Sequence, residues 1–127
     1  MIPKFRVWLP DTTQMLRVKA LVFEKDRTRC VCGYSFDFSL EDENATIMQS
    51  TGLCDKVGTE VFEGDVLHHQ IQTEYTFVVK YDKDKGRWYG DGLSRTYRID
   101  ITKDFLQYYR VIGNIYENPE LLEYKGE

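Results

Sequence analysis

The stretch that decides the fold reads Thr73-Glu74-Tyr75-Thr76-Phe77-Val78-Val79-Lys80-Tyr81, then Asp82-Lys83-Asp84-Lys85-Gly86, then Arg87-Trp88-Tyr89. From Tyr75 to Tyr81 every second side chain is aromatic or aliphatic, which is the pattern of a half-buried β-strand. The charged segment that ends in Gly86 has the composition of a turn, so the third segment would pair back on the first. This part of the chain therefore predicts a long β-hairpin.

The same pattern recurs on both sides of this hairpin. A second hairpin is expected from strands at 15–23 and 29–38, joined by the charged turn 24–27. In the latter strand Cys30, Cys32, Tyr34, Phe36 and Phe38 would share one face. Further strands are expected at 4–9, 46–50, 59–62, 66–69 and 109–116. Many short strands with tight turns between them predict a small barrel or sandwich.

Little helix is expected. One short helix is predicted over 102–108 with Asp100 as its cap, after a chain break at Asp91-Gly92. A second helical turn would start at Pro119, with Asn118 in the capping position. Six residues are assigned structural roles in turns or caps: Gly52, Gly58, Gly64, Asp65, Gly113 and Asn118.

Composition limits the classes of protein that fit. The chain has 127 residues and a mass of 15.0 kDa, which suits one domain. With 42% hydrophobic and 14% aromatic residues it can bury a core, so an intrinsically disordered chain is excluded. It contains no run of about 18 apolar residues, so no transmembrane helix is expected. The charged residues Lys4 and Arg6 interrupt the N-terminal apolar segment, which argues against a secretory signal.

Charge and cysteine usage suggest a compartment. The formal net charge is −4, which opposes non-specific binding of phosphate backbones. The cysteines are Cys30, Cys32 and Cys54, and this odd number argues against a disulfide framework. The chain is therefore expected in a reducing cytoplasm and not in a membrane.

Three stretches together carry a resemblance to a known family. They are Lys4-Phe5-Arg6-Val7-Trp8, then Met48-Gln49-Ser50-Thr51-Gly52-Leu53-Cys54-Asp55-Lys56-Val57-Gly58 continuing through Leu67, and Val111-Ile112-Gly113-Asn114-Ile115-Tyr116-Glu117-Asn118-Pro119-Glu120-Leu121-Leu122. In this order and spacing they resemble the YopX family of bacteriophage and prophage proteins. The second and third stretches are the specific ones.

The resemblance implies a fold and a setting. It implies a mainly β protein built as a small, partly open SH3-like barrel over 51–117, with additional N-terminal strands in 1–50 and a helical turn and tail in 118–127. It implies a phage or prophage origin and carries over no catalytic or metal residue. Cys54 stands where the family commonly has Lys, which argues against a shared role for this thiol.

The sharpest candidate binding segment lies between Lys80 and Arg98. It combines an excess of basic residues with interleaved aromatic ones, and small β-barrels bind single-stranded nucleic acid with such combinations. Alternating charges in its turn equally fit a solvated hairpin. The candidate residues for nucleic acid or a partner are Lys85, Arg87, Trp88, Tyr89, Arg95, Tyr97 and Arg98.

Metal and catalytic sites are less favoured. The thiols of Cys30 and Cys32 and the imidazoles of His68 and His69 suit zinc as ligands, but their spacing fits no structural zinc motif. Cys54 could be activated by a neighbouring base, yet no signature of a cysteine enzyme surrounds it. The carboxylates around Gly64 are explained by turn chemistry. No catalytic residue, metal site or cofactor is predicted.

The sequence therefore favours a non-enzymatic protein-interaction module. Nine Tyr, seven Phe and two Trp are many aromatic residues for a small β domain, and some are expected at an interface. Exposed strand edges would favour pairing with another chain, so a homo-oligomer is expected, with a phage or host protein as a further candidate partner. A single-stranded nucleic-acid-binding protein is the first alternative, and a small hydrolase is the second.

Overall fold

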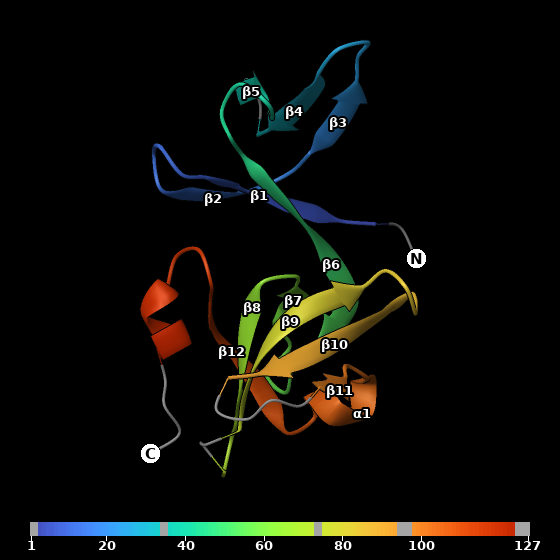
Figure 1. The fold of residues 1–127 in the computed structure, drawn as a ribbon, viewed down its shortest axis with the longest axis vertical. Helices are drawn as coiled ribbons and strands as arrows, with labels where there is room; N and C mark the ends of the chain where they lie inside the picture. Colours follow the sequence, from blue (N-terminus) through green and yellow to red (C-terminus); the bar gives the residue numbers. More distant parts are fainter. Residues whose placement is uncertain (1–2, 34–35, 73–74, 94–97, 124–127) are drawn as a thin grey trace. The chain divides into compact units, whose positions relative to one another are not determined.

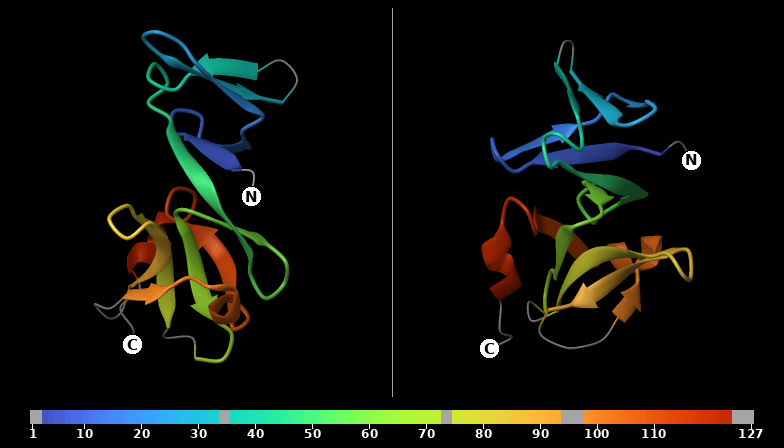
Figure 2. Two further views of the ribbon diagram at one scale, coloured as in Figure 1. Left: turned by 90° about the vertical axis from the view of Figure 1, so that its right-hand side faces the viewer. Right: turned by 45° about the horizontal axis from the view of Figure 1, so that its top comes forward.

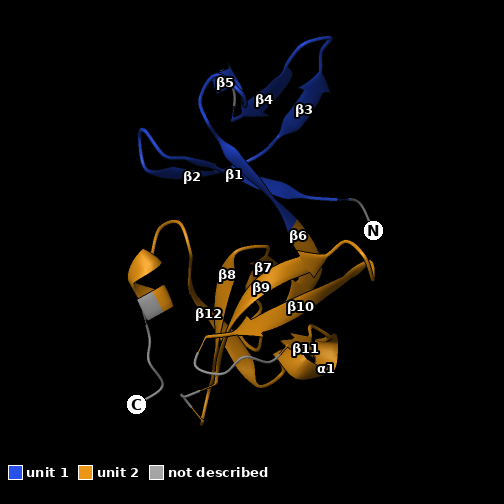
Figure 3. Cartoon of the chain, in the orientation of Figure 1, with its two compact units in different colours: residues 1–49 blue, residues 50–127 orange. Residues whose placement is uncertain are grey.

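The computed structural model describes residues 3–33, 36–72, 75–93 and 98–123. Most of them lie in strands, which confirms the prediction of a mainly β protein. The chain divides into two compact units, Met1–Gln49 and Ser50–Glu127 (Figure 3). Strand β6 (Thr46–Cys54) contributes its first residues to unit 1 and its last ones to unit 2.

Two groups of strands form unit 1. Strand β1 (Phe5–Leu9) pairs with β2 (Gln14–Arg17) and with the start of β6, all antiparallel. Strands β3 (Ala20–Phe23) and β4 (Thr28–Cys32) form a hairpin that β5 (Phe36–Ser39) extends, so β3 and β5 are the edges of a three-stranded sheet. The blue to blue-green strands in Figure 2 show this part of the chain.

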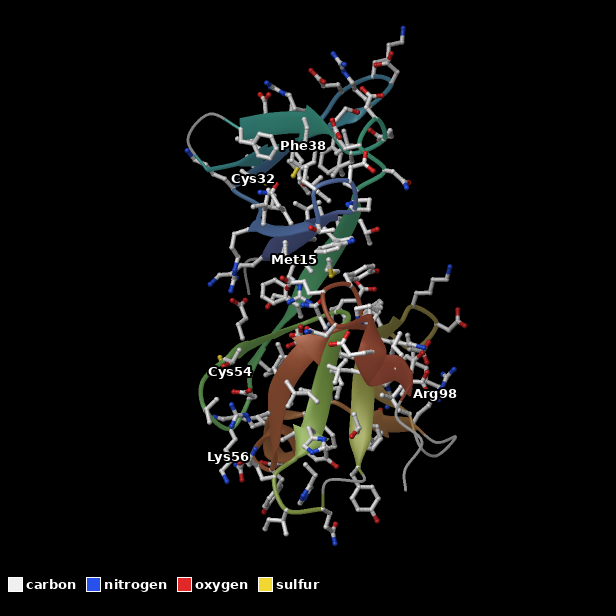
Figure 4. All side chains as sticks on the ribbon, turned by 90° about the vertical axis from the view of Figure 1, so that its left-hand side faces the viewer. Met15, Cys32, Phe38, Cys54, Lys56 and Arg98 are labelled. Carbon is white, nitrogen blue, oxygen red and sulfur yellow. The ribbon has the colours of Figure 1, made fainter. Side chains whose placement is uncertain are left out.

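The strands predicted at 15–23 and 29–38 are each divided in the structure. The first becomes β2 and β3, which belong to different sheets. The second is divided into β4, which ends at Cys32, and β5, which starts at Phe36, and Gly33 after β4 has a φ of +67°. The register pairs Cys30 with Phe38 and Cys32 with Phe36, so these four side chains share a face across two strands (Cys32 and Phe38 are labelled in Figure 4). Tyr34, which was predicted on the same face, lies outside the described residues.

The core of unit 1 is small. Val7, Cys30 and Cys32 are buried at its centre, and Leu16, Leu21 and Phe38 are among the side chains that pack against them. The two thiols behave here as small apolar side chains, with their Sγ atoms 3.8 Å apart and no disulfide between them. The face of the β3-β4-β5 sheet that carries these thiols is less covered at its ends, where Phe23 is 79% exposed and Phe36 is 46% exposed.

Unit 2 is built on a five-stranded antiparallel sheet. Its order is β11-β10-β9-β8-β12, so β11 and β12 are its edges, and β8, the first of these strands along the chain, lies inside the sheet. Figure 2 shows β8 between β9 and β12. The strands are β8 (Asp65–His69), β9 (Thr76–Asp82), β10 (Arg87–Gly92), β11 (Arg98–Asp100) and β12 (Tyr109–Asn114). The short strand β7 (Glu60–Phe62) pairs with the end of β6.

The predicted hairpin is present as β9 and β10. Its register pairs Trp88 with Tyr81 and Gly90 with Val79. The sequence prediction was wrong at Asp91-Gly92, which continue β10 and pair with β9 and β11 instead of breaking the chain. Thr73 and Glu74, at the start of the predicted strand, lie outside the described residues.

The core of unit 2 lies on the concave side of the curled sheet, where Leu67, Phe77 and Val79 are buried with Leu106 and Tyr109. Helix α1 (Lys103–Leu106) places Leu106 in this core (Figure 1). The sequence predicted Asp100 as its cap, which is wrong, because Asp100 ends β11. The hydroxyl of Thr102 accepts the Phe105 N–H at 3.1 Å, which is the standard N-cap bond.

The described part of the chain closes with a 3₁₀ helix, η1 (Pro119–Glu123). Asn118 precedes it as predicted, but its side chain is used differently. Its Oδ1 accepts the backbone N–H of Asn114 at 3.1 Å, so it ties η1 back to β12 instead of capping the helix. Neither helix in the described ranges is long and apolar enough to span a membrane.

Candidate functional site

The predicted binding segment forms one face of the β9-β10-β11 part of the sheet. The strand registers place three basic and three acidic side chains on this face around Tyr89. They form three ion pairs: Lys80 with Asp91 at 2.6 Å, Arg87 with Asp100 at 3.0 Å and Arg98 with Asp82 at 3.9 Å. Of the candidate cations, Arg87 and Arg98 therefore have acidic partners on their own sheet, as does Lys80 of the same segment.

The aromatic residues of the segment are also engaged. Trp88 is half-buried, packs against the core of unit 2 and meets Tyr81 with ring centroids 4.9 Å apart. The Arg98 guanidinium lies over the Tyr89 ring at 4.5 Å, a cation–π contact. Lys85 is exposed in the turn after β9, whereas Arg95 and Tyr97 lie outside the described residues. A charge-balanced face of this kind attracts phosphate weakly.

Asp55 links the turn at 55–59 to β12. Its Oδ1 accepts the N–H groups of Val57 at 3.0 Å and Thr59 at 2.8 Å, and its Oδ2 accepts the Val111 N–H at 2.8 Å. Only 7% of the residue is exposed, so these bonds replace the water that the carboxylate would otherwise keep. Gly58 closes the turn with a φ of +90°.

The turn at Gly64 has a similar design. Gly64 has a φ of +88°, and its N–H donates to the Val79 carbonyl at 2.9 Å. Asp65 is buried, and its Oδ2 accepts the Phe62 N–H at 2.7 Å across the turn. Gly52 also has a positive φ and lies where the β6–β7 register shifts. Gly64 and Asp65 thus lie in a tight turn, and Gly52 lies at a strand irregularity.

The C-terminal motif is a third hydrogen-bonded turn. Asn114 is buried, and its Oδ1 accepts the N–H groups of Tyr116 at 3.0 Å and Glu117 at 2.8 Å. Gly113 lies so close to η1 that an added Cβ would overlap Oδ1 of Asn118. The residues that carry the family resemblance thus form turns and tie strands together.

The groups weighed for zinc or catalysis are dispersed. Cys30 and Cys32 lie in the core of unit 1, where burial raises the pKa of the Cys30 thiol to about 12. Cys54 is exposed in unit 2, next to Lys56 and on the side opposite Arg98 (Figure 4). Among the described residues no three His, Cys, Asp or Glu side chains are arranged to hold a metal ion.

The surface cavities lined by described residues include three that offer a place for a ligand or partner. One of about 480 Å³ is lined by Cys54, Lys56 and Lys103 in unit 2. One of about 550 Å³ runs beside β3 in unit 1, and one of about 670 Å³ lies beside His69 in unit 2. The last two cavities were not predicted from the sequence, because each is lined by segments that are separated along the chain. The pair Tyr108-Tyr109 after a short helix was the available signal for the cavity beside His69.

The fold defines the class of this protein: a small, mainly β chain of two units, with a curled half-barrel sheet in the second. A family model described as YopX protein matches residues 4–123. The chain belongs to the YopX family, as the three sequence stretches predicted. The finer expectation of an SH3-like barrel stays a prediction.

Two solved structures share the fold. The crystal structure of protein EF1440 from Enterococcus faecalis has a TM-score of 0.69 and 29% identity, over 96% of this chain and 99% of that chain. The crystal structure of protein yopX from Bacillus subtilis has a TM-score of 0.59 and 20% identity, over 95% of this chain and 96% of that chain. Comparison with the curated proteins gives no match.

Proposed function

We propose that this protein is a non-enzymatic protein-interaction module that associates with itself, encoded by a phage or prophage and acting in the cytoplasm of the bacterial host. The observation that carries the proposal is the three-stranded sheet of unit 1, whose edge strands β3 and β5 pair with no further strand among the described residues. Each edge strand has an exposed aromatic side chain at one of its ends: Phe23 is the last residue of β3, and Phe36 is the first residue of β5. Unpaired strand edges are templates for pairing with another chain.

The two edges are complementary in charge. The cavity beside β3 is lined by the basic side chains of Lys4, Arg17 and Lys19 together with the ring of Phe23. Strand β5 contains Asp37, which pairs with Arg29 of β4 at 3.3 Å, and runs into the loop 40–44, where Glu41, Asp42 and Glu43 supply the negative charge. Pairing of β3 in one copy with β5 in a second copy would join a basic edge to an acidic one, whereas pairing of β3 with β3 would oppose like charges.

This arrangement is head-to-tail, because different surfaces of the two copies meet. Continued addition would give a ring or a chain of subunits, with the three-stranded sheets joined edge to edge. The nucleic-acid alternative receives less support, because Lys80, Arg87 and Arg98 are ion-paired within their own sheet. A phage or host protein with an acidic edge strand would occupy the same cavity in competition with a second copy.

Replacing Phe23 tests the proposal. Phe23→Lys removes the exposed ring and adds a cation to an already basic edge, so we expect a monomer where the unmodified protein forms an oligomer in multi-angle light scattering. Ile71→Lys is the matched control, because Ile71 is 84% exposed in unit 2 and its loss removes similar apolar surface. A monomeric unmodified protein at about 100 μM, a concentration above the Kd of a stable interface, would refute self-association.

A further inference from the structure

The cavity beside His69 in unit 2 combines aromatic walls with acidic side chains. Its volume is about 670 Å³, within the range of small-ligand sites. It is lined by parts of β8, β11 and α1 and by the start of β12. Four rings besides the imidazole line it: Tyr75, Phe105, Tyr108 and Tyr109.

These rings form a connected set. Phe105 and Tyr109 stack with centroids 4.1 Å apart, and the His69 ring meets Tyr109 edge-on at 5.0 Å. The rings of His69 and Tyr108 are parallel within 5°, with centroids 6.4 Å apart. Tyr109 is buried and holds the set in place, whereas Tyr108 is 59% exposed and offers its ring to a ligand.

The imidazole of His69 is held in a fixed orientation. Its Nδ1 accepts the backbone N–H groups of Ile71 at 3.1 Å and Gln72 at 2.9 Å. The ring is thereby positioned beside Tyr108 and Tyr109 and adds to the aromatic wall.

The charged side chains among the described lining residues of the cavity are acidic. Asp100 and Asp104 line it, and no Lys or Arg is among its described lining residues. The Asp100 carboxylate already forms an ion pair with Arg87 at 3.0 Å, whereas Asp104 forms no ion pair within the described ranges. Aromatic faces and carboxylates both attract cations, and few other ligands gain from both.

We infer that this cavity binds the side chain of an arginine presented by a partner protein. A guanidinium is planar and stacks on aromatic rings, and its fork of N–H donors pairs with a carboxylate such as Asp104. It is also less strongly hydrated than an ammonium, so it enters an aromatic cavity with a smaller loss of water contacts. This site is separate from the β3 edge and is independent of the self-association proposed above.

The test titrates the full-length protein with Nα-acetyl-arginine methylamide, observed by NMR through the amide signals of Thr102, Tyr108 and Tyr109. Nα-acetyl-citrulline methylamide is the probe for comparison, because it keeps the shape of arginine without the charge. We expect saturable shifts with a Kd in the range of about 1 to 10 mM for arginine, and binding of citrulline at least about threefold weaker. Equal binding of the two probes would overturn the inference.

Two variants locate the site. Asp104→Asn and Tyr108→Ala should each weaken arginine binding by about threefold, since one removes a carboxylate and the other a ring. Asp84→Asn and Tyr81→Ala are matched controls on exposed residues of the same unit and should leave the binding unchanged. An unchanged Kd in both Asp104→Asn and Tyr108→Ala would overturn the inference, as would equal binding of the matching lysine derivative. The monomeric Phe23→Lys variant should still bind arginine, which separates this test from that of self-association.

Discussion

The carboxylate of Asp55 holds its turn in place by hydrogen bonds and not by hydrophobic packing. It accepts three backbone N–H groups, two from its own turn and one from Val111, which is 56 positions further along the chain. A turn in a small unit gains little from hydrophobic burial, so such bonds define its geometry. Within the family-like stretch that begins at Met48, the role of Asp55 is therefore to hold the backbone of its turn by hydrogen bonds.

Removal of this carboxylate should destabilise unit 2. Asp55→Ala leaves the part-buried N–H of Val111 and two N–H groups of the turn without their acceptor, and we expect a loss of about 2–4 kcal/mol in the free energy of unfolding. Urea denaturation followed by tryptophan fluorescence measures it. Asp84→Ala, on an exposed turn, is the control and should change the stability by less than about 0.5 kcal/mol. Equal urea midpoints for the two variants would contradict the structural role of Asp55.

Gly113 is required by a close approach. An added Cβ would overlap Asn118 Oδ1 and lie 3.0 Å from Leu121 Cδ1. Gly113→Ala should therefore cost about 1–3 kcal/mol, because η1 must move and the Asn114–Asn118 hydrogen bond is lost. Asn118→Ala removes the overlapping atom, so the double variant should be more stable than the sum of the two single effects predicts. Strict additivity in urea denaturation would show that the two residues do not meet.

At the scale of elements, β4 isolates two thiols from solvent. Burial, followed by the neighbouring Cys32, raises the pKa of Cys30 from an ordinary value near 9 to about 12, and burial also raises the pKa of Cys32. At pH 8 a disulfide reagent such as Ellman's reagent should therefore modify only the exposed Cys54 in the folded protein. In denaturant all three cysteines should react. Rapid reaction of more than one thiol in the folded protein would contradict the assigned core.

The same shift has a consequence for stability. In the unfolded chain Cys30 loses its proton above about pH 9, whereas in the folded chain it keeps the proton up to about pH 12. The unfolded state is therefore stabilised by ionisation across this interval, and the free energy of unfolding should fall as the pH rises from 9 to 12. Cys30→Ala should reduce this slope in alkaline denaturation, and an unchanged slope would contradict a buried, protonated thiol.

Elements with local signals were predictable from the sequence. The β9–β10 hairpin and the turns at Gly58 and Gly64 follow from alternation and from glycine, which act within a few residues. The division at Gly33 was missed because Arg29 to Phe38 alternates without interruption across it. The extension of β6 beyond Ser50 was missed because Gly52 lies in a register shift, which sequence alternation does not reveal.

The candidate sites were less predictable. The charge pattern between Lys80 and Arg98 suggested a basic surface, but Asp100 follows in the chain and pairs with Arg87 across the β10–β11 ladder. The aromatic cavity joins His69 to residues 99–109, and only the sheet order brings β8 and β12 together. Local patterns carry no information on such long-range pairing.

At the scale of the whole molecule, the proposal is head-to-tail pairing of β3 with β5. Phe23→Lys blocks the β3 edge and Phe36→Lys blocks the β5 edge. In a solution of one variant alone, every molecule carries the same blocked edge, so the intact edges find no partner. When the two variants are mixed, the intact β5 edge of the first meets the intact β3 edge of the second. A head-to-tail contact therefore predicts recovery of association, limited to two subunits.

Multi-angle light scattering of the two variants, alone and in a 1:1 mixture, tests this most directly. The mass of one chain is 15.0 kDa. We predict that each variant alone elutes with that mass, that the mixture forms a species of twice that mass and that the unmodified protein forms a larger assembly. A mixture that stays monomeric beside an oligomeric unmodified protein, or an unmodified protein that is itself a monomer, would contradict edge pairing as the basis of this protein's function.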